Sequence, residues 1–186
     1  MSQTTTSVIQ YINFYFLYLY VHEPNIYFKK NTMKQSELRK IIKEEIKAIL
    51  SESTRARVGI KSTSGKIKSI YVHYDGGLSN VGADLKKYYK NIDKVKQLLN
   101  LGNLSSIGKE IGEKQDFKNP HDGWTVAYAR DRGERKQPAK ISNDVDTFIK
   151  DTDYTSGEFA YYYDLTDKSW YYAKLSGGVN TAFKKL

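Results

Sequence analysis

The sequence predicts an α+β domain, in which a mostly antiparallel sheet of about five strands has two or three helices packed on one face. Three observations support this fold class. Paired segments of alternating polar and apolar residues surround turn residues, as in β-hairpins. Two segments between these pairs place apolar residues at helical spacing. The chain then closes with two aromatic-rich alternating segments, so helices and antiparallel strands share one domain.

The elements follow in order along residues 55–186, which we expect to form a single domain. A hairpin is predicted over 55–74. Ile67 and Ile70 would point to opposite faces of its second strand, so the sequence does not decide the register of the hairpin. The patterns then predict helices over 81–91 and 93–102, a strand over 123–131 and a short helix over 143–151. Asn143 or Asp144 is the expected cap of that last helix. A second hairpin over 158–175 closes the domain.

Two different segments precede this domain. In residues 1–32, half of the residues are Ile, Asn, Tyr, Phe or Lys, which are encoded by AT-rich codons. We therefore interpret 1–32 as a mis-annotated or disordered leader, with Met33 as the natural start; a real membrane-surface extension is the alternative. Residues 33–52 read as an amphipathic helix that Ser36 caps, and this helix either docks on the domain or binds another protein. The apolar run over 8–21 is too short to span a membrane.

Composition limits the classes of function. The formal net charge is +9, and residues 55–186 hold 23 Lys and Arg against 16 Asp and Glu. This balance favours anionic partners such as nucleotides or nucleic acid, although it also serves solubility. The chain has no cysteine, which excludes disulfides and thiolate chemistry. Its 16 tyrosines suit half-exposed sheet faces or stacking surfaces.

The stretch YVHYDGGLSNVGADLKKYY (71–89) is the first candidate binding site. A strand ends there in a glycine turn, and the turn leads into a basic helix. Backbone N–H groups at such a helix start can hold a phosphate or carboxylate, with a histidine alongside and a lysine adding positive potential. The alternative is a turn that uses glycine for geometry alone. The candidate ligand-binding residues of this stretch are His73, Asp75, Gly76, Gly77, Ser79 and Lys86.

The segment YARDRGERK (128–136) is the second candidate site. Arg130 and Arg132 follow a predicted strand, and arginine forks recognise phosphate through two hydrogen bonds. Tyr128 beside them could stack on a base. The alternation with Asp131 and Glu134 is equally typical of a surface loop that pairs its own charges.

Metal and covalent chemistry have weaker support. His73, Asp75, His121 and Asp122 could ligate a metal only if their loops converged, and we assign no metal ligand. No nucleophile motif is present, and the glycines match neither the dinucleotide nor the P-loop fingerprint, so no cofactor is predicted. We assign no catalytic residue, and the sequence favours a binding protein over an enzyme.

Several motifs carry a family resemblance. The segment MKQSELRKIIKEEI (33–46) resembles an N-terminal helix that recurs on proteins of tailed bacteriophages. The body, with IYVHYDGG, VGADL and LGNLSSIG, is similar to a small tailed-phage family over roughly 55–175. The resemblance implies a phage accessory protein acting in the host cytoplasm, in host takeover or anti-defence, and it implies no particular activity.

These observations lead to one expected function and two alternatives. We expect the protein to bind an anionic ligand, a nucleotide or a nucleotide-derived signal, without catalysis. One alternative is a sequence-tolerant nucleic-acid-binding protein. The other is an interaction module that uses the helix over 36–51 to bind a virion or host protein.

Overall fold

The computed structural model describes residues 54–175 and 182–186, which form one α+β body. The predicted leader (1–32) and amphipathic helix (33–52) lie outside the described residues. In the described part of the chain, no helix is long and apolar enough to cross a membrane.

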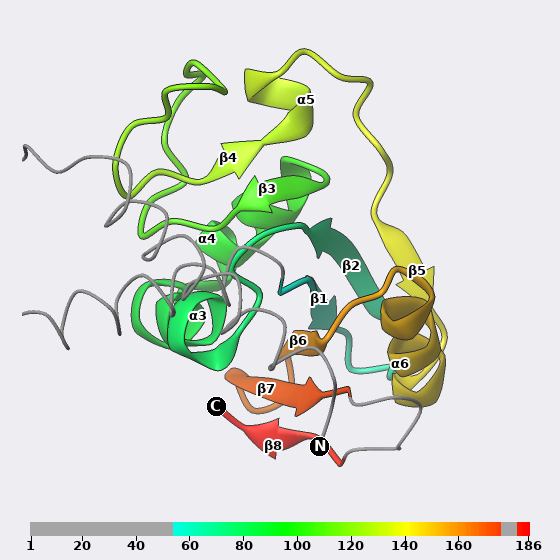
Figure 1. Ribbon diagram of the computed structural model, residues 1–186. Coiled ribbons are helices and arrows are strands. Elements are labelled where there is room, and N and C mark those ends of the chain that lie inside the picture. The colour runs from blue at the N-terminus through cyan, green and yellow to red at the C-terminus, as the bar shows by residue number, and fades with distance from the viewer. Residues whose placement is uncertain (1–53, 176–181) are drawn as a thin grey trace, which may run out of the picture. The chain divides into compact units, whose positions relative to one another are not determined.

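A mixed sheet forms the centre of this body (Figure 1). Its order is β4-β3-β2-β1-β6-β7-β8, and β5 pairs with the first half of β2. The pairs β1–β6 and β2–β3 are parallel, and the remaining pairs are antiparallel. The strands are β1 (Ala56–Lys61), β2 (Ile67–Val72), β3 (Leu104–Ser106), β4 (Val126–Ala127), β5 (Lys140–Ser142), β6 (Phe159–Asp164), β7 (Ser169–Lys174) and β8 (Lys184–Lys185).

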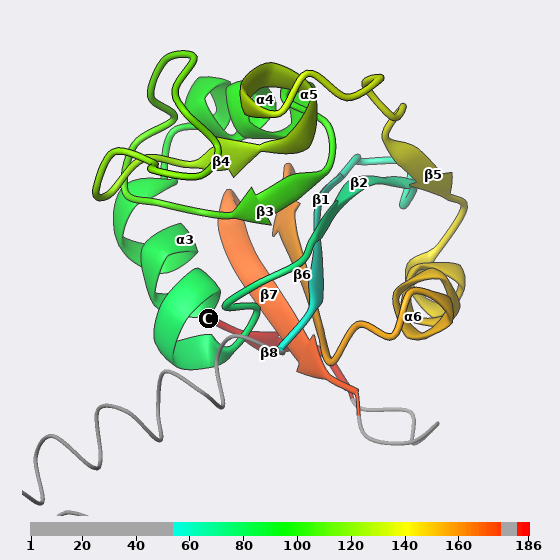
Figure 2. The same cartoon turned by 45° about the horizontal axis from the view of Figure 1, so that its top comes forward.

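Helices lie on both faces of the sheet, with α3 and α6 on opposite sides in Figure 2. The α4 helix carries Asn91 as its cap, whose side chain accepts a hydrogen bond from the N–H of Asp93. Asp144 caps α6 in the same way through the N–H of Thr147, which settles the choice between the two predicted caps. The helices are the π-helix η1 (Leu78–Gly82), α3 (Ala83–Tyr88), α4 (Ile92–Asn100), α5 (Tyr128–Asp131) and α6 (Val145–Tyr154).

Each face of the sheet has its own apolar core. On one face, α3 and α4 pack against a cluster that includes Val58, Ile70 and Tyr161. On the other face, α6 covers a smaller cluster that includes Ile67 and Phe148. The opposite phase of Ile67 and Ile70 is thereby explained, because both faces of β2 are buried. All six residues of β6 are buried for the same reason.

The predicted hairpins and the α+β class are confirmed, and three details of the predicted fold are wrong. The described residues form eight strands rather than five, because β3, β5 and β8 contain only two or three residues and show no alternation. The helices cover both faces of the sheet rather than one. The sheet itself is mostly antiparallel, as predicted, with five antiparallel and two parallel pairs among its described strands. The strand expected over 123–131 stops at Ala127, where the Asp131 carboxylate accepts the Ala127 N–H at 2.8 Å and starts α5.

Candidate functional site

The end of β2 presents three rings beside the start of β3. The His73 N–H donates to the carbonyl of Leu104 (3.0 Å), and the Tyr74 N–H donates to that of Ser105 (2.8 Å). The Tyr71 hydroxyl lies 3.3 Å from His73 Nδ1, as expected for residues on the same side of a strand. These backbone bonds hold the rings at the end of β2, against β3, rather than on a free loop.

Two segments distant in sequence complete the ring cluster. Asn103 accepts the Tyr71 N–H through its side chain (3.1 Å), and its carbonyl accepts the Tyr128 N–H (3.3 Å). Asn103 therefore holds β2 and α5 side by side. We call the resulting group the aromatic surface; it consists of Tyr71, His73, Tyr74, Phe117 and Tyr128.

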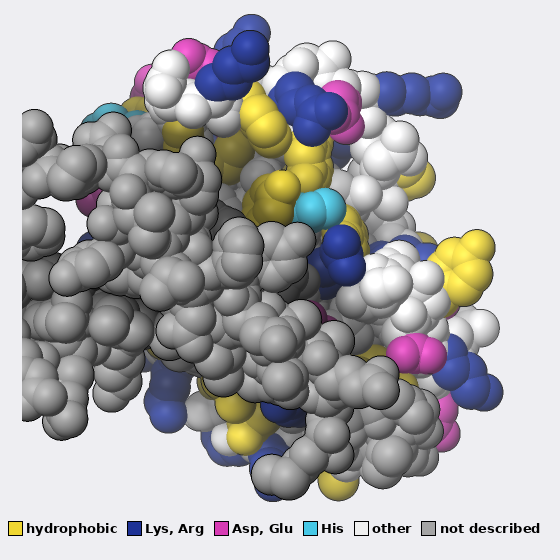
Figure 3. Space-filling view, viewed as in Figure 1, with side chains coloured by type: hydrophobic (Ala, Val, Ile, Leu, Met, Phe, Trp, Pro, Cys, Tyr) yellow, Lys and Arg dark blue, Asp and Glu magenta, His cyan; other side chains and the backbone are white. Residues whose placement is uncertain are grey.

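The rings of the aromatic surface contact one another but remain open to solvent. His73 lies edge-on to Tyr74 and Tyr128, with centroids 4.3 and 6.5 Å apart. Phe117 and Tyr128 are tilted by 31° at 5.5 Å. Tyr74 is 40% exposed. Figure 3 shows hydrophobic side chains gathered around a histidine, with basic side chains at their edge. Such open rings can stack on a planar ligand.

Arginines border the aromatic surface. The Arg132 guanidinium lies over Phe117 and Tyr128, 5.3 and 5.5 Å from their centroids, a cation–π arrangement. Arg132 is also paired with Glu134 at 3.0 Å, and both side chains are about half exposed. Arg135 lines a cavity beside the aromatic surface, together with Tyr71, His73 and Tyr128. A phosphate would therefore find guanidinium groups beside the rings.

A cavity of about 200 Å³ opens between β2 and α5 within this group. Drug-sized ligands occupy pockets of roughly 300–1,000 Å³, so this cavity fits a single ring system rather than a whole dinucleotide. Its lining consists of Tyr71, His73, Asn103, Tyr128, Ala129, Glu134, Arg135 and Gln137.

The titratable rings of the cavity are neutral near pH 7. Burial lowers the pKa of His73 below its usual value, and the positive charge of Arg55 lowers it further. Burial raises the pKa of Tyr71 and of Tyr128. Neutral His73 is a stacking and hydrogen-bonding ring rather than a cation for phosphate. The positive charge of the site therefore comes from arginine.

The predicted glycine turn has a structural role. The positive φ falls on Asp75 (60°), which tolerates it as an aspartate, and not on either glycine. A Cβ on Gly76 would lie 2.7 Å from the carbonyl carbon of Arg55, so glycine is needed there for close packing. The Gly76 carbonyl accepts the Tyr161 hydroxyl at 2.9 Å, which ties the turn to β6. Gly76 therefore serves geometry, as in the alternative for this turn, whereas a Cβ on Gly77 would meet no atom closer than 4.0 Å.

The other candidates of the first stretch lie outside the cavity. Asp75 accepts the side-chain amide of Asn80 (3.0 Å), and Ser79 donates to the same residue (2.8 Å). No side chain caps η1, which begins at the exposed Leu78 after Gly77. Lys86 is exposed on α3. Of the six residues, only His73 lines the cavity.

Arg130 does not face the cavity either. Its Nη1 donates to the carbonyls of Ile111 and Gly112 at 2.8 and 3.0 Å, and its Nη2 donates to the carbonyl of Thr125. Nε and Nη2 also bond the two oxygens of Asp131. These contacts use the five N–H donors of a guanidinium, so no donor remains for a ligand.

The possible metal ligands are only partly brought together. Asp75, His121 and Asp122 line a separate hollow of about 420 Å³ with Asp84, whereas His73 lines the aromatic cavity. In the described ranges, no group of three or more His, Asp or Glu side chains is placed to hold a metal ion.

Sequence reasoning found His73, Tyr128 and Arg132 but missed the rest of the site. Tyr71 and Tyr74 belong to the quoted strand, and its aromatic content was the available signal. Asn103 and Phe117 come from segments without periodicity, and only the fold brings Asn103 to the cavity and Phe117 to the aromatic surface.

No protein-family model, curated protein or solved structure matches this chain.

Proposed function

We propose that this protein binds a nucleotide-type ligand, an aromatic base that carries a phosphate, at the aromatic surface. The single observation that carries the proposal is the position of Arg132 over two rings of that surface. The base enters the 200 Å³ cavity and stacks on Tyr128 or His73. The phosphate replaces Glu134 as the partner of Arg132, with Arg135 alongside.

Binding without chemical change is part of this proposal. The polar groups that face the cavity are two neutral phenols, a neutral imidazole, two amides, the Arg135 guanidinium and one carboxylate, Glu134. Glu134 is exposed and already paired with Arg132. Its pairing makes it a competitor of the phosphate rather than a base held against a substrate.

The test is a thermal-shift panel on the full chain with mononucleotides, cyclic dinucleotides, ADP-ribose and short oligonucleotides. A ligand that binds only the folded state raises the melting temperature by mass action. We expect a mononucleotide-sized ligand to give a shift that Arg132→Ala reduces and Glu134→Gln increases. Lys86→Ala is the matched control, because it removes an exposed positive charge from α3, away from the cavity. Equal effects of Arg132→Ala and Lys86→Ala would contradict the proposal.

Single-stranded nucleic acid is the second candidate ligand. It is favoured by the rings that extend beyond the cavity to Tyr74 and Phe117, and by the net charge of the domain. In that case the shift would require oligonucleotides and would weaken steeply with salt, since each neutralised phosphate adds about −0.7 to the slope of log K against log salt. The interaction module remains a proposal on residues 36–51, outside the described residues.

A further inference from the structure

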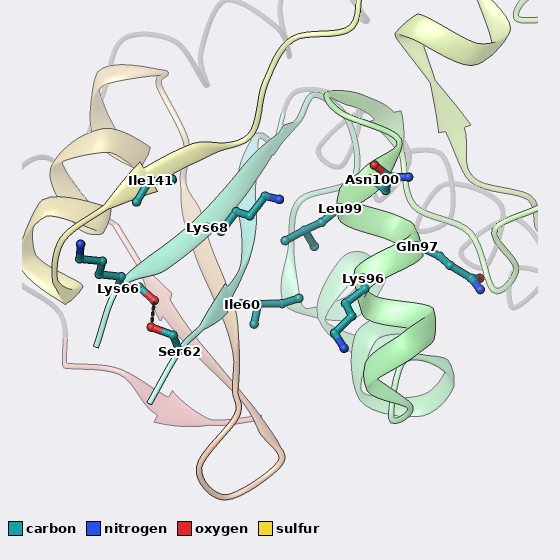
Figure 4. A pocket seen from close by; sticks show the side chains of 9 residues that line it. All are labelled: Ile60, Ser62, Lys66, Lys68, Lys96, Gln97, Leu99, Asn100 and Ile141. Carbon is teal, nitrogen blue, oxygen red and sulfur yellow. Dashed lines mark hydrogen bonds between the residues drawn. The ribbon is translucent and has the colours of Figure 1, made fainter. Parts of the chain in front are cut away.

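A groove with an apolar floor and lysines along its rim lies between α4 and the β1–β2 hairpin (Figure 4). Its volume is about 660 Å³, more than three times that of the aromatic cavity. None of its residues lines the aromatic cavity. We call it the lysine groove; it is lined by Ile60, Ser62, Lys66, Lys68, Lys96, Gln97, Leu99, Asn100 and Ile141.

The register of three strands builds one wall of the lysine groove. Ile60 of β1 is paired with Lys68 of β2, and Lys68 is paired with Ile141 of β5. The three side chains therefore form a row across neighbouring strands, on the face that α4 covers only in part. Leu99 faces this row from α4 (Figure 4). Ile141 remains 64% exposed, although it belongs to a strand.

The lysines of the groove differ from those on the other face of the same strands. Lys61 of β1 is paired with Asp164 at 3.0 Å, and Lys140 of β5 is paired with Asp151 at 2.8 Å. Lys66 and Lys68 form no ion pair with any residue in the described part of the chain.

The third lysine of the rim is only loosely paired. Lys96 is 3.7 Å from Asp93, and both side chains are more than half exposed. Among the residues that the structure describes, no acidic side chain lines the groove. An apolar floor under three ammonium groups is complementary to a ligand with an apolar body and an anionic head.

We propose that the lysine groove binds a free single-chain anionic amphiphile, such as a medium-chain carboxylate. The chain would lie on Ile60, Leu99 and Ile141, and the head would contact Lys66 and Lys68. The groove has the volume of a small-molecule site. A bilayer is not the source, because the exposed large apolar side chains of the described residues are few and scattered. They are Tyr74, Leu78, Ile141 and Tyr154.

The test is calorimetric titration of the full chain with decanoate, and with 1-decanol as the uncharged probe. We expect decanoate to bind at least about tenfold more tightly than decanol, because charge-assisted hydrogen bonds to lysine add to burial of the chain. Octanoate and dodecanoate extend the test, since each further buried methylene tightens binding by up to about fourfold.

Variants locate the binding. Lys66→Gln with Lys68→Gln removes both unpaired charges from exposed positions, and decanoate affinity falls at least about tenfold. Ile141→Ser weakens binding severalfold by removing apolar floor. Lys86→Gln and Tyr154→Ser are matched controls at exposed positions outside the groove, and they leave affinity unchanged.

Three outcomes would overturn the proposal: no decanoate binding, equal binding by the Lys66/Lys68 variant, or binding of an acidic peptide with apolar side chains in place of decanoate. The nucleotide proposal is tested separately, because Lys66→Gln and Lys68→Gln leave the aromatic surface intact. Failure of one proposal therefore does not decide the other.

Discussion

Arg130 and Arg132 stand two residues apart, and the structure uses them in opposite ways. Arg130 is enclosed by three backbone carbonyls and by Asp131, whose side chain is fully buried. Arg132 lies open over two aromatic rings, with one exposed carboxylate as its partner. The first arginine fixes the loop that precedes β4, and the second is available to a ligand. Identical side chains acquire different roles from the acceptors that the backbone places around them.

The largest expected effect is on stability at Arg130. Arg130→Ala removes the partner of a buried carboxylate and the donor to the carbonyls of Ile111 and Gly112, whereas the Thr125 carbonyl keeps the Gln115 side-chain amide as a donor. We therefore expect a loss of about 3 kcal/mol of unfolding free energy. Arg132→Ala removes an exposed pair and changes stability by less than about 0.5 kcal/mol. Urea denaturation of both variants measures the difference. A loss at Arg132 as large as that at Arg130 would remove the distinction between the two regions.

A second matched pair lies in the glycine turn. In Gly76→Ala the new Cβ meets backbone atoms of Arg55 and Ala56 within 3 Å, and we expect a loss of about 2 kcal/mol. In Gly77→Ala the nearest atom, Cγ2 of Thr54, is 4.0 Å away, and φ is −73°. That variant is neutral or slightly more stable, because alanine restricts the unfolded chain. Denaturation midpoints of the two variants decide whether the turn is structural; equal losses would contradict the packing explanation.

A third expected effect on stability depends on pH and arises at Asp131. Burial alone would raise the pKa of this carboxyl, but hydrogen bonds from Arg130, Ala127 and Gln115 outweigh burial and hold the pKa below its usual value of 3.8. A carboxyl with a lowered folded-state pKa stabilises the fold fully above its ordinary pKa, and the contribution is lost as pH falls through the folded value. Asp131→Asn therefore destabilises at pH 7.

Acidification checks this assignment. The stability gap between wild type and Asp131→Asn should narrow once the pH falls below about 3.8. Urea midpoints at pH 7, 5 and 3 measure the gap. A gap that stays constant across this range would show that the charge of Asp131 does not contribute.

The contrast between local patterns and contacts of distant segments explains which parts of the fold could be predicted from the sequence. The hairpins and the α4 and α6 helices follow from alternation, helical spacing and caps, which are local properties. The sheet order does not, because the parallel β1–β6 contact joins strands about a hundred residues apart and β3, β4 and β5 are too short to show a period. Because both faces of the sheet are buried, β2 carries apolar residues on both sides, and the sequence could not show which face Ile67 occupies.

In the candidate site, the types of residue could be predicted from the sequence, but the contacts of each residue could not. Residue types indicated rings and arginines for an anionic ligand, and His73, Tyr128 and Arg132 do lie together. The pattern could not distinguish Arg130 from Arg132, since the carbonyls of Ile111, Gly112 and Thr125 carry no sequence signal. It also gave Gly76 and Lys86 a place beside the ligand, although neither lines the cavity.

The most direct test of the central claim is a map of backbone amide chemical shifts of the full chain during titration with AMP and GMP. The account predicts shifts concentrated at 71–74, 103 and 128–137, with Arg132→Ala weakening the interaction about tenfold through loss of a charge-assisted bond. Shifts centred on the glycine turn and α3, or no saturable shift with either nucleotide, would contradict it.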